Sequence, residues 1–130
     1  MHRSMTLLAL SIGAALASSA MAQAPHGATC AALLAPVCRA NLTRASADLN
    51  ARFDEVARCL TGAADARAAD GLAWIETTTE LLDIPRLSRF GLSLAQVDEV
   101  VAKTARASST AGNPVVLTPD ELAAIYEAAL

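Results

Sequence analysis

The spacing of the apolar residues after Pro25 limits this chain to one kind of fold. They recur at intervals of three and four, and no stretch alternates between apolar and polar residues as a half-buried strand does. The only extended apolar run, Val115 to Leu117, is too short to build a sheet. Alanine and leucine are abundant and aromatic residues make up 3% of the chain, which favours helices. The sequence therefore predicts an all-α domain of about five helices over residues 25–130.

The first three of these helices are outlined by periodicity and by helix breakers. One helix is expected over 28–41, where Pro36 should kink it or close its first half. A second runs from 47 to a natural stop at Gly62. A third contains the apolar spacing of 72–82 and should end before Pro85, because the residue before a proline is pushed out of helical geometry.

The last two helices carry clear start signals. Ser93 followed by Gln96 forms a capping box, and Thr118, Pro119 and Glu121 combine an N-cap hydroxyl, a first-position proline and a reciprocal carboxylate. The expected inward stripe of the fourth helix is Leu94, Val97, Val101 and Ala105. Nothing after Pro25 indicates a domain boundary, so 25–130 is expected to be one helical domain.

Residues 1–24 form a separate apolar N-terminal segment. A short basic start precedes an apolar run at Thr6–Ala17, and Ala20-Met21-Ala22 is a small-x-small site before Gln23. This order is typical of a secretory signal peptide, which would make the protein secreted or periplasmic. The run is shorter than the roughly 20 apolar residues that a spanning helix needs, so no membrane span is expected.

Charge and cysteine content exclude some classes of function. The net charge of −3 comes from mixed signs without a basic stripe, so the chain has no electrostatic footprint for nucleic acid. The cysteines Cys30, Cys38 and Cys59 form no Cys-x-x-Cys pair, and structural thiols are expected. The adjacent carboxylates, such as those at 54–55 and 120–121, point in different directions on a helix and are expected to be surface or first-turn charges.

Several short motifs occur in a characteristic order along residues 25–130. The chain has Pro25-His26-Gly27 opening a helix, then Ile84-Pro85-Arg86-Leu87-Ser88, then Ala107-Ser108-Ser109-Thr110-Ala111-Gly112-Asn113-Pro114, then Leu117-Thr118-Pro119-Asp120-Glu121-Leu122. In this order they resemble the C-terminal helical domain of the iron-type, group III alcohol dehydrogenases. One departure is Thr110-Ala111, where that family commonly has Met-Lys.

The resemblance gives a second interpretation of residues 1–24. Met5, Leu7, Gly13 and the Ala15-Leu16-Ala17 stretch resemble the alanine-rich helix that precedes the histidine pair in that family. On this interpretation the segment is a family helix remnant and the protein is cytoplasmic. Both interpretations of the N-terminus stay open at the level of sequence.

The resemblance also implies a metal site. His26 would be the last ligand of iron or zinc, together with one Asp and two further His, and the metal would polarise the substrate oxygen while a hydride moves to or from NAD(P). In this chain the Asp-x-x-x-His pair would lie upstream of residue 1, and the next histidine would fall between Ala22 and Pro25, where no such segment exists. The six glycines are isolated, so no phosphate-binding loop is present.

These observations predict a truncated or split iron-type alcohol dehydrogenase that lacks the dinucleotide-binding lobe and most metal ligands. Neither iron or zinc nor NAD(P) is expected to bind this chain alone, and the chain is expected to be inactive alone. A complementary chain could carry that lobe, and the surface that meets it should favour self-association. The alternative is a small secreted helical protein, mature from Gln23, with a binding or structural role.

Overall fold

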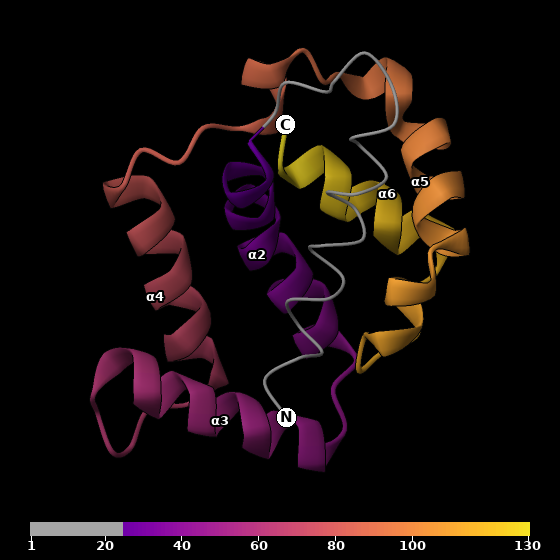
Figure 1. Ribbon diagram of the computed structural model, residues 1–130. Helices are drawn as coiled ribbons and strands as arrows, with labels where there is room; N and C mark the ends of the chain where they lie inside the picture. Colours follow the sequence, from indigo (N-terminus) through magenta and orange to yellow (C-terminus); the bar gives the residue numbers. More distant parts are fainter. Residues whose placement is uncertain (1–24) are drawn as a thin grey trace.

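A computed structural model describes residues 25–130, which form a bundle of helices with short connections (Figure 1). Within this range there are five α-helices and no strand, so the predicted all-α class and helix number are confirmed. The helices are α2 (His26–Thr43), α3 (Ala47–Thr61), α4 (Ala68–Leu81), α5 (Val97–Arg106) and α6 (Pro119–Ala128). Three short 3-10 helices lie between α4 and α6: η1 (Leu87–Phe90), η2 (Leu94–Gln96) and η3 (Ser108–Gly112).

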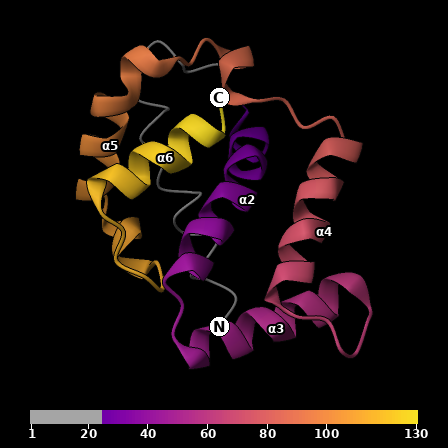
Figure 2. The same ribbon diagram turned by 180° about the vertical axis from the view of Figure 1, so that it is seen from behind.

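Helix α2 stands in the middle of the bundle. Helices α3 and α4 flank it on one side and α5 and α6 on the other, and views from the front and from behind agree on this arrangement (Figures 1 and 2). The C-terminus lies beside the beginning of α2. The molecule therefore has two halves that share one helix.

Pro36 lies inside α2 without ending it, so the expectation that it closes the first half of the helix is wrong. Its missing N–H leaves the Ala32 carbonyl without the usual donor. The neighbours Ala35 and Val37 are both buried. Packing on two sides holds the helix through the proline, because tertiary contacts supply most of the stability of a helix in a protein.

The half containing α5 and α6 has a closed core, which we call the α5–α6 half. Its buried apolar residues come from α2, η1, α5 and α6, together with Leu92 and Ala129. Tyr126 is completely buried, and its hydroxyl donates to the Ser93 carbonyl at 3.0 Å. The Leu87 amide donates to the Ala129 carbonyl at 2.9 Å, and this bond ties the chain end to η1.

The half containing α3 and α4 has a smaller core, which we call the α3–α4 half. Its buried members are Ala35 and Cys38 from α2, Phe53 from α3 and Ile75 from α4. Helices α3 and α4 approach closely at Gly71, where an added Cβ would lie 2.8 Å from the Ala57 Cβ. Only glycine fits at this crossing, since real Cβ atoms essentially never come within 3.0 Å of another atom.

Both ends of α3 follow local capping rules, whereas the start of α4 donates a hydrogen bond to a side chain of α3. The Ser46 hydroxyl accepts from the Leu49 amide at 3.2 Å, and Gly62 ends α3 with a left-handed φ of 73°. The predicted stop at Gly62 is therefore confirmed. The first turn of α4 is capped from outside its own sequence, because the Ala68 amide donates to Asp54 Oδ1 at 2.7 Å.

The expected inward stripe of α5 is partly wrong. Gln96 Oε1 accepts from the Ser93 amide at 2.8 Å, as the capping box predicts, but Leu94 is 63% exposed. The first turn is the 3-10 helix η2, which has fewer residues per turn and shifts the following side chains around the axis. The buried positions of α5 are consequently Val100 and Thr104.

Candidate functional site

His26, the predicted metal ligand, is the first residue of α2, directly after Pro25 at the N-cap. Its side chain is exposed, and its Nε2 lies 3.6 Å from the Sγ of Cys30, one turn further along the helix. Burial raises the pKa of the Cys30 thiol. The pair follows from i, i+4 spacing on a helix, a signal that was available in the sequence.

His26 and Cys30 together offer two possible metal donors. No group of three His, Cys, Asp or Glu side chains that could hold a metal comes together within residues 25–130. Catalytic transition-metal sites use three protein ligands and an open position. The residues of this range therefore supply two possible metal ligands, which is fewer than a catalytic metal site needs.

The other two cysteines differ in their surroundings. Cys38 is 1% exposed, and burial raises the pKa of its thiol to about 12, so it stays protonated at neutral pH. The expectation of a structural thiol is confirmed at this position. Cys59, in contrast, lies exposed on α3.

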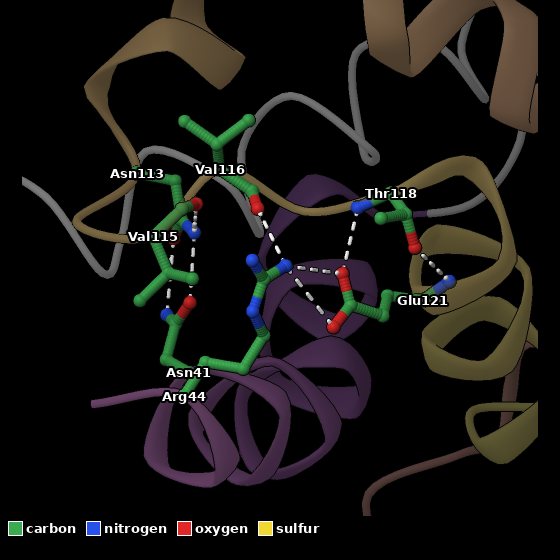
Figure 3. A network of polar contacts seen from close by, with 7 residues as sticks. All are labelled: Asn41, Arg44, Asn113, Val115, Val116, Thr118 and Glu121. Atoms are coloured by element: carbon green, nitrogen blue, oxygen red, sulfur yellow. Dashed lines mark hydrogen bonds and ion pairs between the residues drawn. The ribbon is translucent and has the colours of Figure 1, made fainter.

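The segment between α5 and α6 carries the motif that ends in Asn113 and Pro114, and side chains of α2 hold this segment in place (Figure 3). Asn41, fully buried, exchanges two amide hydrogen bonds with Asn113, at 3.0 and 2.7 Å. Asn113 also donates to the Val115 carbonyl at 2.6 Å. Since each amide satisfies the other, the pair fixes the loop against the C-terminal half of α2.

Arg44 makes the second link between this segment and α2. Its Nη1 donates to the Val116 carbonyl at 2.9 Å and lies 3.0 Å from Glu121 Oε2 (Figure 3). The same carboxylate accepts from the Thr118 amide at 2.7 Å, as the predicted capping box requires. The Thr118 backbone hydrogen bond, with Arg44 beside it, holds the pKa of Glu121 below its usual range. The motif at 117–122 thus has a structural role that connects α6 to α2.

Two hollows lie beside α2. The first is a cleft of about 620 Å³ between α2, α4 and α6 with a mixed lining of small apolar residues and charged ones, which include Arg39, Glu76, Arg86 and Glu121. Arg39 and Glu76 form an ion pair across it.

The second hollow is an apolar groove of about 870 Å³ over α2, α3 and α4. Apolar side chains dominate its walls, with Arg52 and Glu55 among its polar members. Its apolar walls include Ala31, Leu34, Leu49, Leu60, Trp74 and Leu82.

This geometry defines an all-α domain with an exposed histidine at the start of its central helix (Figure 1). Residues 6–130 match the Fe-containing alcohol dehydrogenase family, C-terminal, and the chain belongs to this family. The match includes most of the apolar N-terminal segment, which lies outside the described residues.

The fold is similar to that of a solved dehydrogenase. The structure of iron containing alcohol dehydrogenase from Thermococcus thioreducens, in a tetragonal crystal form, superposes with a TM-score of 0.77 at 26% identity. The alignment covers 94% of this chain and 31% of that one, so the chain spans about a third of the length of this relative. No curated protein sequence matches the chain. None of the helices described in residues 25–130 is both long and apolar enough to span a bilayer.

Proposed function

We propose that this chain is the helical lobe of a metal-dependent alcohol dehydrogenase and that it works only in combination with a dinucleotide-binding lobe supplied from outside residues 1–130. In the assembled enzyme, His26 would be one ligand of iron or zinc. The metal would polarise an alcohol or carbonyl oxygen while a hydride moves to or from NAD(P).

The position of His26 is the observation that carries this proposal. Its imidazole stands exposed at the mouth of α2, where a second lobe can approach it, and Cys30 is the one neighbouring donor that the helix provides. Two donors do not hold a catalytic transition metal, so the remaining ligands have to come from elsewhere. The family match and the shared fold support the oxidoreductase class.

We further propose that the apolar run Thr6–Ala17 is retained as part of the domain and that the protein is cytoplasmic. The support for this is that the family match begins at residue 6, inside that run. The intact mass of the protein from its native host tests this point. A mass that lacks residues 1–22 would replace the proposal by the secreted alternative.

The function is tested by metal binding and turnover with the purified chain. Because Cys30 lies beside His26, we now expect zinc or ferrous iron to bind weakly at these two side chains. NAD(P)-linked oxidation of short alcohols should stay at background. The His26→Ala variant should abolish the residual binding, whereas a Cys59→Ala control, on exposed α3, should leave it unchanged. Metal-dependent NADH formation by the chain alone would contradict the proposal.

The complementary lobe is tested by isolating the protein under native conditions. We expect a second chain with a glycine-rich phosphate loop to co-purify, and alcohol oxidation in that complex to be lost with His26→Ala. A complex whose turnover does not respond to this substitution would remove His26 from the metal site.

A further inference from the structure

The apolar groove over α2, α3 and α4 is open in the described part of the chain, and two large side chains are left uncovered there. Trp74 is 40% exposed and Leu82 is 66% exposed, although both belong to the walls of the groove. Leu81, the residue before Leu82 in the sequence, is also 80% exposed. A contiguous apolar surface of this kind marks a place where another apolar element binds.

We infer that the occupant is the chain's own run Thr6–Ala17, docked in this groove as a short helix. The run has no charged residue, and none occurs between Ser4 and Ala24. Leaving it in water would expose leucine and isoleucine side chains that the groove can bury. This inference rests on the proposed retention of the run in the mature protein and does not depend on the proposed catalytic role.

The dimensions agree with this occupant. A helix of the twelve residues from Thr6 to Ala17 is about 18 Å long at 1.5 Å per residue. The groove follows α3 from Leu49 to Leu60, which counted in the same way is also about 18 Å. The apolar run and its receiving wall therefore have matching lengths.

The connection to the rest of the chain also permits it. Residues 18–24 separate the run from Pro25 and reach up to about 23 Å when extended. Ala31 and Leu34, in the first half of α2, already belong to the groove wall. An intramolecular occupant has a high effective concentration at such a short tether, which favours it over a second copy of the chain.

The cleft between α2, α4 and α6 suits this run less well, because charged side chains stand in its lining. Its lining contains Arg39, Glu76, Arg86 and Glu121, and an uncharged apolar helix placed there would desolvate these groups without satisfying them. Of these two hollows, the groove has the more apolar lining and therefore suits the apolar, uncharged run better.

Two native reporters in the groove make the inference testable. Trp74 is the single tryptophan of the chain, and Cys59 is an exposed thiol in the groove wall. We would compare the intact chain with the double variant Leu8→Asp/Ile12→Asp, which charges one face of the run. Ser19→Asp, between the run and Pro25, is the matched control.

In the intact chain we expect Cys59 to be alkylated on the order of tenfold more slowly than in the double variant, which corresponds to 1.4 kcal/mol of docking. Trp74 emission should shift to the red, and its quenching by iodide should rise, in the double variant only. Cys38 should stay unreactive throughout, because a variant that merely unfolds would expose this buried thiol as well.

Equal Cys59 reactivity and equal Trp74 emission in the intact chain and the double variant would overturn the inference. So would protection that disappears on dilution together with a dimer in sedimentation, since the occupant would then be a second copy. Failure of the catalytic proposal changes neither readout, so the two are distinguished.

Discussion

The two halves of the molecule share α2 but close around it differently. Within residues 25–130, nine buried residues form the core of the α5–α6 half, and hydrogen bonds join the segment before α6 and the chain end to distant elements. In the α3–α4 half, four buried residues form the core, and a groove remains open beside Trp74. The α5–α6 half is thus a well-packed scaffold, whereas the α3–α4 half leaves apolar surface exposed in its groove.

This difference shows how one helical lobe can be stable and still incomplete. Contacts within the α3–α4 half are mostly local, between two helices joined by a short loop, and they include the close approach of Gly71 to Ala57. Contacts in the α5–α6 half connect residues far apart in sequence, such as Asn41 with Asn113. Stability inside a protein varies in this way between cooperative regions.

The largest effect should come from removing the central side chain of the α5–α6 half. Tyr126→Ala empties a fully buried site and should lower the free energy of unfolding by about 3–5 kcal/mol. Tyr126→Phe keeps the ring and loses only the bond to the Ser93 carbonyl, so it should cost about 1 kcal/mol. Denaturant titration followed by circular dichroism measures both. Similar costs for the two variants would contradict a packed ring.

In the α3–α4 half, the most sensitive point is the helix crossing. Gly71→Ala places a methyl group against Ala57 and should destabilise the protein by about 1–3 kcal/mol. Gly27→Ala is the control, because its added Cβ meets nothing within 4 Å. Thermal unfolding of the two variants makes the comparison, and an unchanged Gly71→Ala melting temperature would show that α3 and α4 do not touch there.

The next largest loss of stability should come from breaking the amide pair between α2 and the segment before α6. Asn113→Ala leaves the buried Asn41 amide without its partner, which should cost about 1–3 kcal/mol. Asn50→Ala, at an exposed position on α3, serves as the control and should be nearly neutral. If both variants unfold at the same denaturant concentration, the pair does not fix the loop.

The smallest effect is the pH dependence of stability that comes from one carboxyl group in each half, Glu121 and Asp54. Hydrogen bonds and a nearby arginine hold the pKa of Glu121 below its ordinary 4.5, and Arg67 and the Ala68 amide hold that of Asp54 below its ordinary 3.8. A carboxyl group whose pKa is lower in the folded protein than in the unfolded chain stabilises the folded protein at pH values above its unfolded-state pKa. This stabilisation is lost as the pH falls through its folded-state pKa. Glu121→Gln and Asp54→Asn should therefore lower the melting temperature at pH 7 and converge with the parent protein near pH 2–3. A constant difference at every pH would contradict this assignment.

The sequence predicted the helix number, the stops at Gly62 and before Pro85, and the caps at Ser93 and Thr118, because these depend on residues close together in the chain. It missed the cap that Asp54 provides to α4 and the pairing of Asn41 with Asn113, since nothing local connects residues so distant. The expectation that Leu94 is buried was wrong, because the 3-10 helix before α5 changes which side chains face the core.

The candidate site was predictable to a similar degree. Its single helix-mouth histidine was identified from the Pro-His-Gly motif, and the neighbouring thiol of Cys30 follows from helical spacing. The apolar groove was not predictable, because its walls come from three helices and its openness depends on how they splay. Residues 1–24 lie outside the described residues, so their two interpretations remain predictions.

Amide hydrogen exchange of the intact chain tests the division into a closed and an open half most directly. We expect the slowest amides in the second half of α2 and in α5 and α6, with α3 and α4 exchanging through an opening of lower free energy. If the amides of α3 and α4 outlast those of α5 and α6, the account of a well-packed scaffold joined to an incomplete half is wrong.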